Sequence, residues 1–201
     1  MGKTLIEMIA GADGLTLGAA FERADSSLIG ADAGELVGLG PIGVPVQADV
    51  ATASGRFDAL IDFSVPEATL SLLPLLVAAE KKLVSGTTRF DASGQAAIEA
   101  AGEKIAILKA PNMSVGVNVV FKLIEIAASV LGDDVDVEVI EAHHRHKIDA
   151  PSGTAVRMGE ILAGALGRDL EKDAIYGRQG TTGPREKRTI GFATVRGGDI
   201  V

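Results

Sequence analysis

Histidine occurs at three positions of this 201-residue chain, and all three lie within four consecutive residues: His143, His144 and His146. Imidazole is the only side chain whose unperturbed pKa lies between pH 5 and 8, so this cluster is suited to proton transfer. A basic stretch leads from it into a Pro-Ser-Gly-Thr turn at 151–154, in a chain of net charge −8. The segment is therefore predicted to be a proton-transfer site that also binds an anion. The alternative is a polar loop between a strand and a helix.

Together with Glu141, the same histidines also resemble a set of metal ligands. Neighbouring side chains of a strand point to opposite faces, however, so His143 and His144 are not expected to face one ion. The chain has no cysteine and no histidine elsewhere that could complete a tetrahedral shell. We therefore predict no metal at this cluster.

The elements on either side of the cluster are expected to position it. Apolar and polar residues alternate over 135–140, which predicts a strand with one covered and one wet face. A helix is predicted over 154–166, and the free N–H groups at a helix N-terminus bind anions. The turn that opens this helix is thus expected to hold a carboxylate. This half is also expected to contain a long apolar helix over 115–131, a mobile loop over 177–188 and a strand over 189–195.

The first half alternates strands with helices, which indicates βαβ units and a parallel sheet. Pro66 is expected in the first turn of its helix, where a missing N–H costs nothing, and Pro74 is expected to kink or divide that helix. The predicted elements are a helix over 5–10, a strand over 15–21, an extended piece over 43–46, a strand over 57–63, a helix over 66–81, a strand at 83–84, a helix over 92–102 and a strand over 105–108.

Polar residues follow these strands at the ends where a doubly wound sheet binds its ligand. Glu22 and Arg23 come directly after the strand over 15–21, where a carboxylate can bind a ribose and a guanidinium can bind a 2′-phosphate. The alternative for this pair is a solvated strand end, since such loops are usually polar. The segments 86–88 and 110–113 end two further strands and offer backbone N–H groups and small side chains. We therefore predict a dinucleotide site.

A Rossmann unit begins with a strand and a Gly-x-Gly-x-x-Gly turn, and its acidic residue lies about 20 residues beyond that turn. Counting back from Glu22 reaches residue 2. We therefore expect Gly2 to be the last glycine of the turn, and the first strand and most of the loop to lie before Met1.

Composition limits the classes of function. Hydrophobic residues make up 47% of the chain and aromatic residues 3%, so the core is expected to be aliphatic. The acidic balance and the few aromatic side chains argue against nucleic-acid binding. No uninterrupted apolar run reaches the ~18 residues of a membrane span. We expect a soluble cytoplasmic protein that does not bind membranes.

With these residues in view, the chain resembles the 4-hydroxy-tetrahydrodipicolinate reductase (dihydrodipicolinate reductase) family of lysine and diaminopimelate biosynthesis. The resemblance runs over residues 1–201, and its most specific element is the segment 141–155, Glu-Ala-His-His-Arg-His-Lys-Ile-Asp-Ala-Pro-Ser-Gly-Thr-Ala. It implies reduction of a cyclic imine dicarboxylate by NADH or NADPH, with loss of water, in an enzyme that forms a homotetramer. Supporting matches lie at 21–23, 61–67, 86–88, 110–118 and 191–196.

The resemblance also implies a role for individual residues. The proton donor falls on His143 and a second donor on Lys147, and substrate contacts fall on His144, Gly153 and Thr154. Cofactor contacts fall on Met1, Glu22, Arg23, Gly86, Thr87, Thr88, Ala110, Pro111, Asn112 and Met113.

The expected fold class is α/β, with two domains. A Rossmann-like dinucleotide-binding domain over 1–113 is followed by an α+β substrate-binding and oligomerisation domain over 114–201. Family members have a leading strand and Gly-rich loop, and continue beyond 198–201 into further strands. We therefore expect this chain to be incomplete at both ends relative to the family, and the alternative function is a non-catalytic member that binds the dicarboxylate but not the cofactor.

Overall fold

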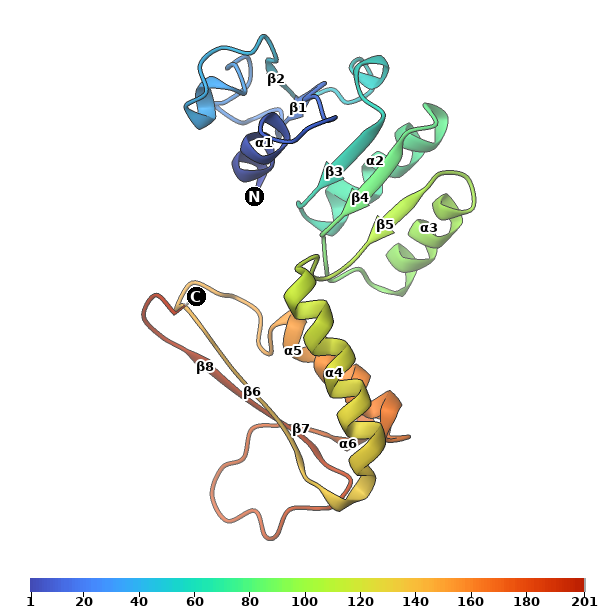
Figure 1. Ribbon diagram of the computed structural model, residues 1–201, viewed down its shortest axis with the longest axis vertical. Coiled ribbons are helices and arrows are strands. Elements are labelled where there is room, and N and C mark those ends of the chain that lie inside the picture. The colour runs from blue at the N-terminus through green and yellow to red at the C-terminus, as the bar shows by residue number, and fades with distance from the viewer. Residues whose placement is uncertain (201) are drawn as a thin grey trace. The chain divides into compact units, whose positions relative to one another are not determined.

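The computed structural model describes residues 1–200 and contains two compact units, Met1–Ala110 and Pro111–Val201 (Figure 1). Both units combine helices with parallel strands. This arrangement confirms the α/β fold class expected from the alternating pattern of strands and helices. Each unit is described separately below.

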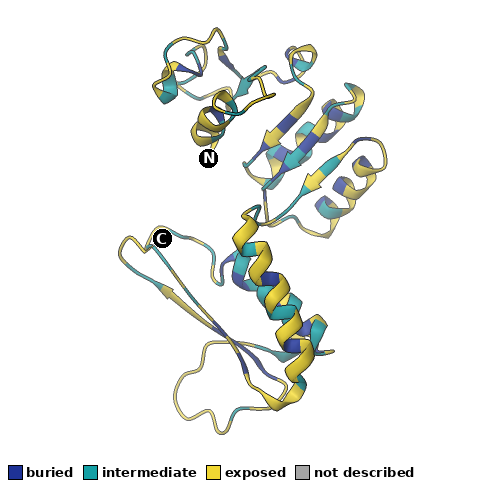
Figure 2. Ribbon diagram, in the orientation of Figure 1, coloured by how far each residue is buried: buried dark blue, intermediate teal, exposed yellow. Residues whose placement is uncertain are grey.

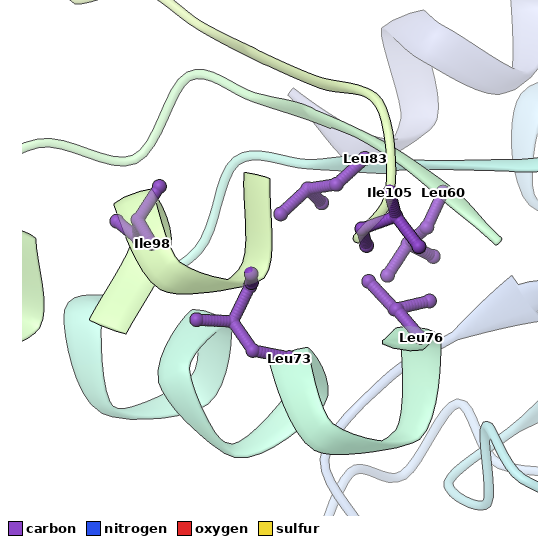
Figure 3. Packing of buried hydrophobic residues seen from close by; sticks show 7 residues of the cluster. Leu60, Leu73, Leu76, Leu83, Ile98 and Ile105 are labelled. Atoms are coloured by element: carbon purple, nitrogen blue, oxygen red, sulfur yellow. The ribbon is translucent and has the colours of Figure 1, made fainter. Parts of the chain in front are cut away.

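The main sheet of the first unit has three parallel strands in the order β3 (Ala59–Asp62), β4 (Lys82–Ser85) and β5 (Ile107–Lys109). Two helices, α2 (Pro66–Ala78) and α3 (Ala92–Gly102), form the connections between consecutive strands. Parallel neighbours need such crossovers, so the predicted βαβ units are present. The core between helices and sheet is aliphatic, as expected; Figure 3 shows Leu60, Leu73, Leu76, Leu83, Ile98 and Ile105 packed together.

Helix α2 passes through Pro74 without dividing, so of the two outcomes predicted for this proline, a kink or a division, the division is wrong. Leu73 and Leu76 flank Pro74 and are both buried in the core, and this burial offsets the lost backbone hydrogen bond. The helix ends at Ala78 rather than Lys81. Glu80 adopts a left-handed conformation with φ 53°, which stops the helix before the residue predicted to end it.

The first 58 residues contain little regular structure apart from α1 (Gly2–Ala10). The strand predicted over 15–21 is reduced to β1 (Ala20–Phe21), paired in parallel with β2 (Val46–Gln47). Because β2 is two residues long, the remaining residues of the apolar run have no ladder partner there. The short 3₁₀ helices Glu35–Val37 and Ser54–Arg56 complete this region.

The second unit begins with α4 (Val115–Leu131) and the 3₁₀ turn Gly132–Asp134. Its sheet has the order β6 (Val137–His143), β8 (Ile190–Arg196) and β7 (Ala174–Tyr176), with both pairs parallel. Helix α5 (Gly153–Ala165) packs on this sheet, and the short α6 (Leu170–Asp173) precedes β7. The sequence pattern did not predict α6 or β7, because each is too short to show a period. The core consists of Val137, Val139, Ala155, Ala163, Ile190 and Phe192.

Strands β7 and β8 are parallel neighbours, yet the segment 177–189 joins them without a helix. Two arginines of this segment, Arg178 and Arg185, donate hydrogen bonds to the carboxylate of Glu138 on β6 at 2.8–3.1 Å. That carboxylate lies over Gly191, where a Cβ atom would come within 1.9 Å of it. The loop predicted over 177–188 is therefore tied to the sheet at two points.

Most of α4 is exposed along one face, as Figure 2 shows. The stretch Val115–Asp134 is long and apolar enough to cross a membrane by length and composition, with a mean hydropathy of 1.8. It passes this test although Lys122 and Glu125 interrupt it, which is why counting uninterrupted apolar residues did not find it. One such helix is by itself weak evidence for a membrane segment.

Candidate active site

Strands β6 and β8 bring three charged or titratable side chains to one place in the second unit. Glu141 and His143 are two residues apart on β6, so their side chains lie on the same face of the sheet. Arg196 on β8 is the register partner of His143. The strand predicted to end at Ile140 thus continues to His143, and the first histidine of the cluster is held by the sheet rather than by the loop.

The carboxylate of Glu141 lies between the other two side chains. His143 Nδ1 is 2.6 Å from Glu141 Oε2, and the two terminal nitrogens of Arg196 donate to the two carboxylate oxygens at 2.8 and 2.9 Å. The Glu141 side chain is 10% exposed. The hydrogen bonds from Arg196, assisted by those from His143 and the backbone of Ser152, lower the pKa of Glu141 to about 2 against the opposing effect of burial.

Lys147 and Asp149 form an ion pair in the turn that follows the strand. Lys147 Nζ is 2.8 Å from Asp149 Oδ1, with both side chains about three-quarters buried. The carbonyl oxygen of Asp149 also accepts a hydrogen bond from Arg196 at 2.6 Å. Lys147, the predicted second proton donor, is therefore linked through Asp149 and Arg196 to Glu141. Glu141 in turn contacts His143, the predicted first donor.

The start of α5 presents the donors expected for an anion. Ser152 is the buried N-cap, and its hydroxyl accepts a hydrogen bond from the Ala155 N–H. A Cβ atom on Gly153 would have no heavy atom within 4 Å, so the backbone there is open to a ligand. Thr154 Oγ1 is 3.5 Å from the side-chain amide nitrogen of Asn112. The structure thus brings together a residue predicted to bind substrate and one predicted to bind cofactor.

His144 lies in the turn with its Nδ1 atom buried and without a hydrogen-bond partner among residues 1–200. Its ring centroid is 6.1 Å from that of the exposed His146. A buried, unpaired ring nitrogen is a group that a ligand can satisfy. Within the described part of the chain, no three His, Cys, Asp or Glu side chains are grouped so as to hold a metal ion.

In the first unit, the predicted cofactor segment 86–88 forms a tightly packed turn after β4. The buried Thr87 hydroxyl donates to Asp62 Oδ2 at 3.2 Å and accepts from the Ser64 N–H. Asp62 also accepts from the hydroxyls of Ser64 and Thr69. At Gly86, a Cβ atom would come within 2.1 Å of the Phe63 ring. Thr87 is thus buried in this segment, whereas the Thr88 side chain is exposed.

The other predicted cofactor residues are more open. Glu22 follows β1, and its backbone N–H donates to the Gln47 carbonyl at 3.1 Å. Its carboxylate accepts from the Arg23 N–H, and the Arg23 side chain is 82% exposed, 3.6 Å from Asp25. Ala110 donates its N–H to the Ser85 carbonyl, so the segment 110–113 starts beside the turn at 86–88.

These residues fit a dinucleotide. Helix α1 begins at Gly2 with Met1 as N-cap; within residues 1–200 no side chain caps it, and no acidic residue occupies its first turn. Its free N–H groups suit a pyrophosphate, and the exposed carboxylate of Glu22 suits a ribose diol. A cavity of about 330 Å³ lies near the amino ends of β3 and β4, and its lining includes Val50, Phe57, Leu75 and Leu76. None of the predicted site residues lines this cavity, so it is separate from the predicted cofactor site.

Sequence reasoning missed the residues that hold the site together. Glu141 was considered as a metal ligand and as part of the family segment 141–155, and Asp62, Asp149 and Arg196 lay in matching segments without any role assigned to them. Arg196 lies 55 residues from Glu141, and a contact at that separation leaves no local pattern in the sequence.

Comparisons with known proteins match both halves of the chain. Residues 1–113 match the family model "Dihydrodipicolinate reductase, N-terminus", and residues 116–201 match "Dihydrodipicolinate reductase, C-terminus". Among solved structures, the fold is similar to that of a dipicolinate-bound dihydrodipicolinate reductase from Paenisporosarcina sp. TG-14, with a TM-score of 0.66 and 21% sequence identity. The match covers 98% of this chain and 75% of that one.

Proposed function

The chain belongs to the dihydrodipicolinate reductase family, and from this premise we propose that His143 donates the proton in its reaction. Members of the family are NAD(P)H-dependent oxidoreductases of lysine and diaminopimelate biosynthesis. The substrate of this chain is proposed to be 4-hydroxy-tetrahydrodipicolinate. The observation that carries the role of His143 is its Nδ1 contact with a buried, ionised carboxylate at the end of a strand.

A nicotinamide cofactor, when bound, supplies a hydride. Loss of the 4-hydroxyl of the substrate as water leaves a conjugated ring. Hydride addition to a conjugated carbon of that ring leaves negative charge, which a nearby acid must neutralise. General acid catalysis of this kind contributes about 10²–10⁴-fold. The imidazole of His143 is suited to donate this proton, and Lys147, held by Asp149, is proposed as a second donor.

The substrate carboxylates are proposed to bind at the start of α5. The backbone at Gly153 is open, and the hydroxyl of Thr154 lies beside it. The unpaired Nδ1 of His144 and the ammonium of Lys147 add polar contacts from the preceding turn. Two carboxylates on a rigid ring match a site with several fixed donors.

The cofactor is proposed to be either NADH or NADPH. Glu22 offers a carboxylate to the ribose diol, and the neighbouring Arg23 offers charge to a 2′-phosphate, so both forms should be accepted. The remaining contacts are proposed at Met1, Gly86, Thr87, Thr88, Ala110, Pro111, Asn112 and Met113.

We propose that residues 1–113 form the dinucleotide-binding domain, and that residues 114–201 form the domain for substrate binding and oligomerisation. Exposed apolar residues on the sheet of the second unit, Ile140 on β6 and Val195 on β8, support assembly into a homotetramer. A cytoplasmic location is proposed because the family acts in amino-acid biosynthesis.

The test is a comparison of His143→Ala with His146→Ala, an exposed histidine of the same cluster. We expect His143→Ala to lower kcat by about 10²–10⁴-fold with a smaller change in KM, the pattern of an interaction made mainly in the transition state. His146→Ala should remain close to wild type. Turnover is followed through oxidation of NADH and of NADPH.

Two results would contradict this function. A His143→Ala variant that keeps most of its kcat would remove His143 from proton transfer. Binding of dipicolinate without any binding of NADH or NADPH to the wild-type chain would favour the non-catalytic alternative. A direct titration of each nucleotide against the protein distinguishes these cases.

A further inference from the structure

Glu141 is not proposed above to transfer a proton or to bind substrate, yet its carboxylate is a point where several segments of the second unit meet. Oε2 contacts His143 Nδ1 at 2.6 Å and accepts from Arg196 at 2.9 Å. Oε1 accepts from Arg196 at 2.8 Å and from the Ser152 N–H at 3.1 Å. The carboxylate thus touches strand β6, strand β8 and the start of α5.

We propose that Glu141, held in place by Arg196, is a positioning residue that fixes the tautomer and ring orientation of His143 and ties that ring to the turn at the start of α5. The relevance of this arrangement to catalysis rests on the role proposed for His143. The arrangement of Glu141, Arg196 and His143 does not depend on that role, because it follows from contacts within the second unit.

The tautomer follows from the charge on Glu141. Hydrogen bonds from Arg196 hold the pKa of Glu141 at about 2, so near neutral pH the carboxylate is ionised and can only accept hydrogen bonds. At 2.6 Å from Oε2, Nδ1 of His143 must therefore carry a hydrogen. Nε2 is then left as the ring atom that can exchange a proton with a substrate.

The ring orientation follows from the rigidity of the pair. The guanidinium of Arg196 meets both carboxylate oxygens, a fork geometry that fixes direction as well as distance. Arg196 also donates to the Asp149 carbonyl, so it cannot rotate away without losing a third hydrogen bond. Both charged residues belong to strands, which hold a site more accurately than a loop does.

The same carboxylate also places the anion-binding turn. Ser152 is the N-cap of α5 and is 4% exposed, and its N–H is bound to Glu141 rather than to a helix carbonyl. A shift of the carboxylate would therefore move both the proton donor and the donors at Gly153 and Thr154. Loss of Glu141 should consequently affect kcat and the substrate KM together.

The test is ¹⁵N NMR of the histidine rings in the intact protein and in Glu141→Gln. The chain has three histidines, so the His143 signals can be assigned by comparison with His143→Gln. In Glu141→Gln, the amide oxygen should face the two donors now at Oε1, which are Arg196 and the Ser152 N–H. The amide NH₂ would then take the place of Oε2, so the hydrogen bond from Arg196 at that position is lost, Nδ1 of His143 must accept, and the ring hydrogen moves to Nε2.

We expect this change of tautomer to be accompanied by a fall in kcat of about tenfold or more, part of the contribution that general acid catalysis makes. Arg196→Lys keeps the positive charge but loses the paired hydrogen bonds to the two carboxylate oxygens of Glu141. It should therefore give a mixture of His143 tautomers. It also provides a second measurement if Glu141→Gln does not fold. Glu138→Gln is the matched control. Glu138 lies on β6, the same strand as Glu141, and it also pairs with arginines, Arg178 and Arg185.

An unchanged His143 tautomer in both Glu141→Gln and Arg196→Lys overturns the proposal, whatever the effect on kcat. A change of the same size in Glu138→Gln also overturns it, because the effect would then be a general response of the sheet. A changed tautomer with wild-type kcat supports positioning by Glu141 and removes His143 from proton transfer.

Discussion

At the scale of single residues, charge is concentrated at Glu141. Its carboxylate is about nine-tenths buried, but four hydrogen bonds compensate for its removal from water. A buried ion pair of this kind is costly to break, because removing one partner leaves the other charge without compensation. The stability of the second unit should therefore depend on pH through this residue.

The pH dependence has a definite sign. The pKa of Glu141 falls from 4.5 to about 2 on folding, so its stabilising contribution is complete above pH 4.5 and is lost as the pH falls towards 2. Its size should be of order 3 kcal/mol, since each pKa unit corresponds to about 1.4 kcal/mol. The measurement is the free energy of unfolding by urea as a function of pH.

Other carboxyl groups also lose stabilising contacts in acid, among them Asp32, whose pKa is lowered by backbone hydrogen bonds from Ile42. The comparison that isolates Glu141 is the difference between the wild type and Glu141→Gln. That difference should shrink between pH 4.5 and pH 2. A difference that stays constant over this interval would mean that the charge of Glu141 does not contribute to folding.

At the scale of elements, the turn after β4 illustrates how packing fixes a predicted binding segment. A Cβ atom at Gly86 would come within 2.1 Å of the Phe63 ring, so Gly86→Ala must displace either the ring or the turn. Such overpacking costs about 1–3 kcal/mol. We expect it to weaken NADPH binding, which titration measures, and to lower the melting temperature, which calorimetry measures.

Gly102→Ala is the control for this substitution, because a Cβ atom there would have no heavy atom within 4 Å. It lies in α3 of the same unit and should leave nucleotide affinity unchanged. If Gly86→Ala binds NADPH as well as Gly102→Ala does, the segment 86–88 does not contact the cofactor.

The bounds of long periodic elements could be predicted from the sequence, whereas short strands such as those over 57–63, 83–84 and 105–108 could be predicted only approximately, and α6 and β7 could not be predicted. The bounds of α3 and α4 match the predicted ranges, because eleven and seventeen residues contain several turns of a helical pattern. The prediction for β1 was wrong over 15–19, since a strand depends on a partner that local sequence does not reveal. In the site, the histidine cluster was evident from composition, whereas Arg196 became evident only through its contacts.

At the scale of the whole molecule, each compact unit has its own aliphatic core. One cluster contains Leu76 and lies within the first unit, and another contains Ile190 and lies within the second. Both side chains are almost completely buried. Substitution of either by alanine should cost about 2–5 kcal/mol, and this loss should be confined to the unit that contains it.

Scanning calorimetry of Leu76→Ala and Ile190→Ala checks this independence. We expect two transitions in the wild type, with each variant lowering the temperature of one transition only. A single transition lowered equally by both variants would show that the two units unfold together.

The connection between β7 and β8 limits how the length of this chain can change during evolution. A surface loop usually tolerates both deletion and insertion. Here the segment 177–189 joins two parallel neighbours, so it must travel back along the full strand before β8 can begin. Homologues with a longer segment should therefore be found readily, whereas deletions of more than a few residues should be rare.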